Sequence, residues 1–353
     1  MNVGILTFHR AVNYGAILQA YALQRTIELL GDNAEIIDYR CEFIENEVSP
    51  LSGFRKKDKF VKTIKKFVFR SIKSKAFDKF MNGYLNLSPV IKKNEELNKL
   101  NSRYDCFITG SDQVWNYGCS GSDTSFFLDF VQDDSKKNSY AASFGFDKLP
   151  TSDPFDYQKL LKDYNKISVR EKSGAQIVFD KIGVLPQVTL DPTLLLDRKE
   201  WKKIVLKRPL KEKYIFVYYI REPKDLLKYV DQLAERTKCK IINSKKSVEF
   251  LKKCSPADFL TWIYHADYVV TNSFHGTVFS ILFNKKFVVE LDNGKSINNR
   301  SKELMEVLDV KERELDIYNI DSIKTEIDYL NVENKLQINK EKSILYIKSI
   351  LNK

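Results

Sequence analysis

The chain contains few of the residues that metal sites and disulfide frameworks require. Its 353 residues include three histidines and five cysteines, and no two cysteines form a Cys-x-x-Cys pair. An odd, scattered set of cysteines is typical of a reducing compartment and not of a disulfide framework. Dispersed histidines and unclustered cysteines supply no metal-ligand pattern. We therefore expect no metal site and no cofactor.

Long apolar runs and a targeting signal are also lacking. No apolar run approaches the roughly 18–20 residues that a membrane-spanning helix requires. Met1–Gly4 lacks the basic start of a signal peptide and leads directly into an apolar run. We expect a cytoplasmic protein, either free or peripheral at the inner face of the membrane.

A third absence is the dinucleotide-binding pattern Gly-x-Gly-x-x-Gly, which disfavours NAD binding. The chain nevertheless begins like an α/β protein. The apolar run Val3–Phe8 is followed by a helical pattern over residues 15–30 and by the strand-like run Glu35–Tyr39. Such a βαβ unit predicts a parallel sheet. Asn13–Gly15 occupies the strand-to-helix turn, where α/β folds place ligands.

Negative charge is scarce between residues 55 and 80, which hold most of the charge excess behind the formal net charge of +11. That stretch contains eleven lysines and arginines against Asp58 and Asp78, and apolar residues recur in it at helical spacing. One hypothesis is a basic amphipathic helix on an anionic membrane surface. The alternative, which we favour, is a surface helix whose apolar stripe packs on its own domain. No nucleic-acid-binding motif accompanies the charge, so nucleic acid is not expected as a partner.

Length and composition predict two domains. A chain of 353 residues exceeds the usual size of a single core, and 43% hydrophobic residues are able to build real cores. The composition becomes charged and proline-bearing around Asp197–Leu210. We predict an N-terminal domain over residues 1–200 with a basic helical insertion at about 52–100, a C-terminal domain over 201–330, and a final helix over 331–353.

Polar residues follow strand-like runs at further points of the first half. Gly110–Gln113 comes after the run Tyr104–Thr109 and has the form of a ligand loop, with an ordinary Asx turn as the alternative. Small residues over Ser139–Gly145 predict another strand. Arg170 is expected at the carboxyl end of a strand, where its forked donors suit a carboxylate or phosphate. A buried ion pair with an acidic neighbour is the equal alternative for this arginine.

The second half carries clear signals for helix starts. Ser255–Asp258 combines an N-cap serine, a proline at the first helical position and an acid in the first turn. The β-branched run Tyr268–Thr271 ends in small polar residues, and His275-Gly276 then opens an apolar segment of helix length. Helix N-termini present unpaired backbone N–H groups and a positive dipole end. The turn at His275 is therefore a candidate anion site.

Five segments in chain order resemble the polysaccharide pyruvyl transferase family: Asn13–Gly15, Gly110–Trp115, Ser168–Glu171, Asp191–Thr193 and Asn272–Thr277. The resemblance spans roughly residues 3–310. It implies an α/β fold like that of the GT-B glycosyltransferases, with two Rossmann-like domains facing across a central cleft. It also implies that the C-terminal helix packs back toward the N-terminal domain.

The resemblance further implies a transferase that moves the enolpyruvyl unit of phosphoenolpyruvate onto a sugar of a surface polysaccharide or its precursor. Two sugar hydroxyls then share one carbon as a pyruvate ketal, and phosphate leaves. The implied partners are phosphoenolpyruvate and a nucleotide- or lipid-linked glycan acceptor. Such a site must hold a phosphate and a carboxylate and must move protons, which suits arginine, backbone N–H groups and histidine.

These demands assign roles to particular residues. We expect His275 to be the catalytic residue, through phosphate contact or proton transfer. Arg300 matches an arginine that is common after the last strand of the family. The candidate donor-binding residues are Arg170, Ser273, Gly276, Thr277 and Arg300. The candidate acceptor or cleft loops contain Asn13, Tyr14, Gly15, Ser111, Asp112 and Gln113.

One position departs from the family pattern. Many members carry an arginine two positions before the histidine, where this chain has Ser273. If that arginine grips the donor, then Arg170, Arg300 or the helix N-terminus must compensate here, or the donor is different. Two alternatives therefore stand beside the pyruvyl transferase. One is a GT-B glycosyltransferase that uses a nucleotide-sugar donor, and the other is a non-catalytic glycan- or membrane-binding relative.

Overall fold

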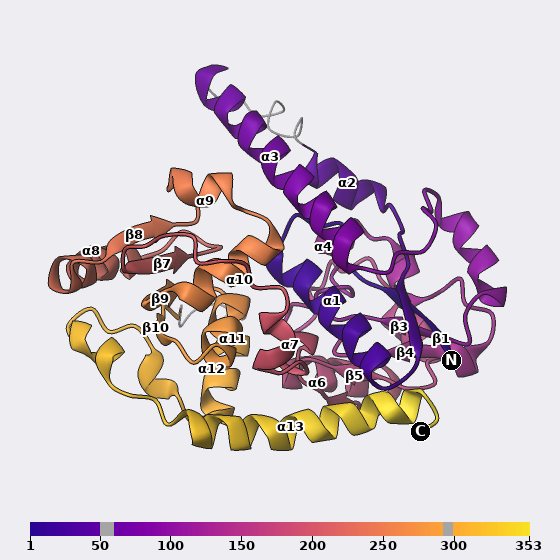
Figure 1. Cartoon of the computed structure of the whole chain (residues 1–353). Helices are drawn as coiled ribbons and strands as arrows, with labels where there is room; N and C mark the ends of the chain where they lie inside the picture. Colours follow the sequence, from indigo (N-terminus) through magenta and orange to yellow (C-terminus); the bar gives the residue numbers. More distant parts are fainter. Residues whose placement is uncertain (50–59, 292–298) are drawn as a thin grey trace. The chain divides into compact units, whose positions relative to one another are not determined.

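A computed structural model of the chain describes residues 1–49, 60–291 and 299–353 (Figure 1). The chain divides into two compact units. The first unit contains Met1–Leu195 and Asn339–Lys353, and the second contains Leu196–Ile338. Each unit is built on a parallel sheet with helical connections, which is the α/β class that the sequence predicts. Residues 55–59 of the predicted basic segment lie outside the described residues.

The first unit contains a four-stranded parallel sheet in the order β2-β1-β3-β4. Its strands are β1 (Asn2–Leu6), β2 (Asn33–Ile36), β3 (Cys106–Thr109) and β4 (Lys137–Ser139). A shorter parallel pair, β5 (Ser168–Val169) and β6 (Gln187–Val188), is joined to β4 by an isolated bridge between Asn138 and Lys166. Because β1 lies between β2 and β3, the order of connection reverses between β1 and β3. Open α/β sheets bind ligands at the carboxyl ends of such a pair of strands.

Helices and short 3₁₀ helices (labelled η) form the connections of the first unit. The α-helices are α1 (Tyr14–Leu29), α2 (Glu42–Val48), α3 (Phe60–Tyr84), α4 (Tyr117–Ser120), α5 (Tyr157–Leu161) and α6 (Lys172–Ile182). The 3₁₀ helices are η2 (Asn94–Ser102), η3 (Thr124–Phe127), η4 (Asp134–Lys136) and η5 (Pro192–Leu194). Asn13 is the N-cap of α1, because its side-chain oxygen accepts hydrogen bonds from the N–H groups of Gly15 at 2.8 Å and Ala16 at 3.4 Å.

The stretch Ser139–Gly145 corrects one prediction. β4 ends at Ser139, and the following residues form a connection instead of a strand. Ala141 has a φ of 47°, a left-handed conformation that a strand does not accommodate. The connection is held instead by bonds to neighbouring loops, such as the one that Ser143 N donates to the carbonyl of Asp112 at 3.0 Å. Ala142 forms isolated bridges with Asp112 and Val169, so the small residues here allow close packing without an extended strand.

The second unit contains a four-stranded parallel sheet in the order β10-β9-β7-β8. Its strands are β7 (Tyr214–Tyr218), β8 (Lys240–Asn243), β9 (Tyr268–Thr271) and β10 (Lys286–Val289). β7 is buried along its whole length, as expected for a parallel strand that is covered on both faces. It lies between β8 and β9, so the order of connection reverses between β7 and β9. The carboxyl ends of these two strands form the switch point of this sheet.

The helices of the second unit include two whose starts the sequence predicts. The elements are α7 (Arg198–Lys202), α8 (Leu226–Thr237), α9 (Val248–Lys252), α10 (Pro256–His265), α11 (Phe274–Leu282), α12 (Asn299–Val307), η7 (Lys311–Arg313) and η8 (Ile320–Lys324). A capping box between Ser255 and Asp258 begins α10, with Pro256 at its first position. α13 (Tyr329–Ile350) starts in the second unit and ends in the first, where the Tyr346 hydroxyl donates to the carbonyl of Ser139 at 3.0 Å.

The C-terminal part of α3 packs on its own unit. Phe77, Phe80 and Met81 are buried, and the Phe77 ring lies 5.0 Å from the ring of Tyr14 on α1. Nearer the helix start, Val68 and Ile72 are 48% and 46% exposed. This earlier part extends beyond the other elements of the first unit (Figure 1). No helix in the described ranges is long and apolar enough to cross a membrane.

Candidate functional site

Serine and threonine side chains build the turn between β9 and α11. Ser273 is the N-cap of α11, and its Oγ accepts a hydrogen bond from Gly276 N at 3.4 Å. Thr277 Oγ1 donates to the carbonyl of Ser273 at 3.0 Å, and Ser273 N donates to Thr271 Oγ1 at 3.0 Å. The helix start that the sequence predicts is therefore present, and its side-chain hydroxyls bond within the turn itself.

His275 is the second residue of α11 and follows the switch point of the second sheet. Its side chain is largely buried. The turn before it is tied to the connection that follows β7, because Asn272 Oδ1 accepts from Ile220 N at 3.0 Å. The Asn272 amide also donates to the carbonyl of Arg221 at 3.3 Å. His275 is thus carried by a turn that two neighbouring strand ends hold in place.

Two helix N-termini at this sheet edge differ in their capping. The N-terminus of α8 is covered by Glu290, the residue after β10, whose Oε1 accepts from the N–H groups of residues 224–226 at 2.7–3.1 Å. The N-terminus of α11 has the neutral Ser273 as its cap and no acidic residue in its first turn. Glu290 therefore already places a negative charge at the first of these anion-attracting positions, whereas the cap and first turn of α11 themselves carry none.

Arg300 reaches the same turn from α12. Its guanidinium carbon lies 5.2 Å from the ring centroid of Phe274, in a cation–π arrangement. The Phe274 ring in turn meets the imidazole of His275 edge-on, with the centroids 5.1 Å apart. The structure thus brings together His275 and Arg300, two of the residues that the sequence singles out, within the second unit.

Sequence reasoning missed two further basic residues at this edge. Arg221 follows β7, and Lys245 follows β8. The Lys245 ammonium lies 4.2 Å from the ring centroid of Tyr219, and burial lowers the pKa of Lys245. Each is the first basic residue after a strand of the sheet, and that position is the signal by which the sequence could have identified them.

In the first unit, a buried polar network joins the loops after β1 and β3. Ser111 N donates to Gln19 Oε1 at 3.0 Å, and Gln19 Nε2 donates to Thr7 Oγ1 at 2.8 Å. Thr7 Oγ1 closes the ring by donating to the carbonyl of Ser111 at 2.9 Å. Ser111 is fully buried, whereas Asn13 is exposed and Gln113 is half-buried. Of the predicted loop residues, Asn13, Gln113 and the likewise half-buried Asp112 are accessible to a ligand.

Arg170 is surrounded by acidic side chains. Its guanidinium nitrogens lie 3.0 Å from Asp191, 3.6 Å from Asp112 and 3.7 Å from Glu171, and its side chain is only 2% exposed. Burial alone would lower the pKa of Arg170, but the three carboxylates raise it. The buried ion pair that the sequence left open as an alternative is therefore present, and it ties Arg170 to the loop that follows β3.

A second buried cluster, which sequence reasoning missed, joins the connections after β1 and β2. The Asp38 carboxylate lies 3.1 Å from His9 Nε2 and accepts from Arg10 Nε at 2.8 Å and from Arg40 Nε at 3.1 Å. Burial raises the pKa of Asp38, but the bonds from His9 and Arg10 outweigh burial and bring that pKa well below its ordinary value. Neither this cluster nor any other group of His, Cys, Asp and Glu in the described ranges has an arrangement that could hold a metal ion.

Solved structures share this fold over nearly the whole chain. A Listeria monocytogenes protein provisionally assigned as a UDP-N-acetylglucosamine 2-epimerase has a TM-score of 0.54 at 11% identity, covering 99% of this chain and 96% of that one. The S. aureus MnaA–UDP structure has a TM-score of 0.50 at 14% identity, with 99% and 97% covered. Arabidopsis thaliana UGT89C1 complexed with UDP-L-rhamnose has 0.50 at 9% identity, with 99% and 98% covered. These likenesses show the fold, and together with the two parallel sheets they define a GT-B-like α/β protein, as predicted.

The chain belongs to the polysaccharide pyruvyl transferase family, whose family model matches residues 13–290. The match confirms the resemblance seen in the sequence, since all five segments lie inside it, whereas Arg300 lies beyond it. No curated protein matches the sequence. Membership places the protein among the transferases of polysaccharide biosynthesis.

Proposed function

We propose that this protein transfers the enolpyruvyl unit of phosphoenolpyruvate to a sugar of a surface polysaccharide or its precursor, forming a pyruvate ketal. The observation that carries the proposal is the position of His275, at the N-terminus of α11 beside the β7–β9 switch point, in a chain of this family. Ligands of open α/β sheets bind at such positions. Arg300, stacked on Phe274, adds a cation to the same turn.

The reaction forms two C–O bonds at C2 of phosphoenolpyruvate and breaks the bond between C2 and the phosphate oxygen. One sugar hydroxyl adds to C2 while the vinyl carbon takes up a proton and becomes a methyl group. The second hydroxyl then displaces phosphate from the same carbon. Of the two hydroxyl protons lost, the balance places one on the methyl group and one on the phosphate. The carbon skeleton stays as it is, and no step requires an oxidant or a reductant.

We assign the donor to the N-terminus of α11. Phosphoenolpyruvate carries a phosphate and a carboxylate, and this N-terminus offers backbone N–H groups and a positive dipole end with only the neutral Ser273 as its cap. Arg300 supplies a forked cation that suits either anion. The Thr277 hydroxyl is bonded within the turn and Gly276 packs against β9, so these two residues shape the donor site through the backbone.

His275 is the residue that we assign to the chemistry. Imidazole changes its protonation state near neutral pH and transfers protons efficiently there. From the first turn of α11 it would deliver a proton to the vinyl carbon as positive charge develops on C2, or hold the phosphate as it leaves. Either role requires a donor that is bound at the N-terminus of α11.

We propose that Arg170 does not bind the donor. Its charge is already balanced by three carboxylates, and a donor anion would have to compete with them in a buried setting. We propose that Arg170 positions the Asp112 loop. That loop, together with Asn13 and Gln113 of the same unit, is assigned to the acceptor.

The assigned acceptor is a nucleotide- or lipid-linked glycan. The MnaA and UGT89C1 structures contain UDP and UDP-L-rhamnose, respectively, so ligands with a nucleotide-linked sugar are compatible with this fold. A lipid-linked acceptor would lie at an anionic membrane surface, and the basic helix α3, with Val68 and Ile72 exposed, supports a peripheral contact there.

Sedimentation with anionic vesicles tests the membrane contact. Lys75 and Lys79 are exposed on α3, and changing both to glutamine should reduce the fraction that sediments with phosphatidylserine vesicles. The matched control changes Lys199 and Lys203 of the second unit to glutamine. Equal sedimentation of the two double variants would contradict the contact and leave packing as the whole role of α3.

Thermal unfolding with different ligands tests the donor. A ligand that binds the native state raises the unfolding temperature by mass action. Phosphoenolpyruvate should therefore raise it, and His275→Ala should reduce the rise. Protection by a UDP-sugar alone would favour a nucleotide-sugar glycosyltransferase. Protection by neither donor would favour a non-catalytic relative.

A further inference from the structure

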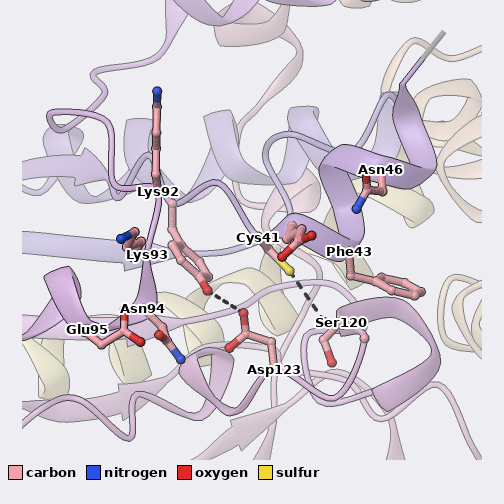
Figure 2. Close-up of a pocket in the computed structure, with 12 residues that line it drawn as sticks. Cys41, Phe43, Asn46, Lys92, Lys93, Asn94, Glu95, Ser120 and Asp123 are labelled. Carbon is pink, nitrogen blue, oxygen red and sulfur yellow. Dashed lines mark hydrogen bonds between the residues drawn. The ribbon is translucent and has the colours of Figure 1, made fainter. Parts of the chain in front are cut away.

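A pocket of about 740 Å³ lies in the first unit (Figure 2). Three segments line it. The first is the connection after β2 together with α2, the second is the start of η2 with the two residues before it, and the third is the end of α4 with the residues that follow. They are Tyr39, Cys41, Glu42, Phe43, Asn46, Lys92, Lys93, Asn94, Glu95, Ser120, Gly121 and Asp123. A cavity of this size is within the range that holds small organic ligands.

Hydrogen bonds between lining residues hold part of the pocket in place. The Tyr39 hydroxyl donates to Asp123 Oδ2 at 2.6 Å, and the Cys41 thiol donates to the carbonyl of Ser120 at 3.6 Å (Figure 2). Asp123 Oδ1 also accepts from Ser125 N at 2.9 Å, as the N-cap of η3. Burial raises the pKa of Cys41 to about 11, so this cysteine stays a thiol at neutral pH. Cys41 therefore contributes a hydrogen bond to the pocket lining and does not act there as a thiolate.

Phe43 supplies an aromatic surface at one end of the pocket, opposite Lys92 and Lys93 (Figure 2). Its side chain is 40% exposed, although phenylalanine is ordinarily buried. Gly121 permits this placement, because a Cβ at that position would lie 2.4 Å from the Phe43 ring. The φ of Gly121 is also 66°, which glycine adopts most readily. The ring is thus held directly on the backbone of the α4 end.

The rest of the lining is polar and of mixed charge. Asn46 and Asn94 carry amides that both donate and accept hydrogen bonds. Two lysines lie among three carboxylates, so no net positive charge gathers there to hold a polyphosphate. Paired donors and acceptors beside an aromatic face suit a neutral sugar, whose hydroxyls do both and whose C–H groups pack on the ring.

The position of the pocket connects it to the acceptor loops of the same unit. Tyr39 follows Asp38, whose carboxylate holds His9 and Arg10 after β1. α4, which ends at the pocket, has Asn116 as its N-cap, shortly after the loop Gly110–Gln113. The pocket is thus continuous in the chain with the loop after β3 and is joined to the end of β1 through the side chain of Asp38.

We propose that this pocket is a glycan subsite that binds a neutral sugar of the acceptor, beyond the residue that receives the pyruvyl group. The assignment to the acceptor rests on the proposed function, whereas the sugar binding itself does not. A chain of two to four sugars should bind more tightly than a monosaccharide, because the longer chain adds contacts in this pocket to those at the acceptor loops. The pocket would then select acceptors by the sugars next to the modified one.

Saturation-transfer NMR with the full chain tests the subsite directly. The probes are neutral di- to tetrasaccharides of glucose, galactose, mannose and N-acetylglucosamine, without phosphoenolpyruvate. At least one should bind, and both Phe43→Ala and Asn94→Ala should weaken its binding about tenfold. The control is Tyr318→Ala, which removes an aromatic residue that is 96% exposed in the second unit.

The outcomes separate the subsite from the proposed function. Absence of binding to every probe, or binding that neither pocket variant weakens, would overturn the subsite even if pyruvyl transfer occurs. Binding that both pocket variants weaken supports it even if phosphoenolpyruvate is not the donor. With an active enzyme, Phe43→Ala should raise KM for an oligosaccharide acceptor and leave KM for the corresponding monosaccharide unchanged.

Discussion

Gly276 lies so close to Thr271 that a Cβ at position 276 would be 2.3 Å from the Thr271 hydroxyl oxygen. That oxygen cannot easily move, because it donates to the carbonyl of Tyr218 at 2.6 Å and accepts from Ser273 N at 3.0 Å. The glycine after the histidine therefore lets α11 start directly against β9. The position of His275 depends on this close contact.

Gly276→Ala should destabilise the protein. Alanine in a helix is favoured over glycine by about 1 kcal/mol, but the overpacking against Thr271 costs typically 1–3 kcal/mol and also displaces the turn. We expect a lower free energy of unfolding in urea. Gly83→Ala on α3 is the control, since a Cβ there meets nothing within 4 Å and should be neutral or stabilising. Equal effects of the two substitutions would contradict the close-contact account.

Two substitutions at Ser273 distinguish an effect on helix stability from an effect on donor binding. Asparagine and aspartate cap helices about as well as serine, so neither Ser273→Asn nor Ser273→Asp should lose the cap. The aspartate places a negative charge where the donor anion is proposed to bind, whereas the asparagine does not. Calorimetric titration should show that phosphoenolpyruvate binds the aspartate variant at least about tenfold more weakly than the asparagine variant. Equal affinities would remove the donor from this helix end.

Arg300 should contribute to donor affinity. Hydrogen bonds to charged groups contribute roughly 1.5–3 kcal/mol, so Arg300→Gln should weaken phosphoenolpyruvate binding by about 10- to 100-fold. Arg198→Gln is the control, because the Arg198 guanidinium lies 5.7 Å from the ring of Tyr264 in the same unit and makes the same kind of contact. If both variants bind phosphoenolpyruvate like the unchanged protein, Arg300 has only a packing role on Phe274.

Asp38 predicts a pH dependence of stability in the first unit. Its pKa in the folded protein is below the ordinary value of 3.8, so its stabilising effect is full above that value and is lost as the pH falls below it. The free energy of unfolding should decline between pH 5 and pH 3 more steeply in the unchanged protein than in Asp38→Asn. Removing the charge leaves Arg10 and His9 without their buried carboxylate, which costs roughly 3–5 kcal/mol at neutral pH. The free energies are measured by urea unfolding at each pH. If they fall equally steeply with pH in both proteins, the account is contradicted.

Element starts with local signals were predictable from the sequence. The capping box of Ser255 and Asp258 and the proline between them lie within the first turn of α10. The small polar residues after β9 likewise mark the start of α11, and so the place of His275. In both cases the residues that decide the structure are neighbours in the chain, which is why pattern reading succeeds there.

The features that the sequence did not predict depend on contacts between segments that are distant in the chain. The sequence left Arg170 equally suited to a ligand or to an ion pair, and only the fold brings Asp191 and Asp112 to it. His9 and Asp38 are likewise joined only because β1 and β2 are adjacent in the sheet. The connection after Ser139 was predicted as a strand because small residues are compatible with either, and its left-handed turn at Ala141 has no signal in the chain.

The most direct test of the central claim is product formation from phosphoenolpyruvate. The purified protein is incubated with this donor and the glycan precursors extracted from its own source, and phosphate release and product mass are followed together. We predict equimolar phosphate and a pyruvate ketal on the glycan, with both lost in His275→Ala while the unfolding temperature is unchanged. Absence of phosphate release and ketal with those precursors, or full turnover by the His275→Ala variant, would contradict the account.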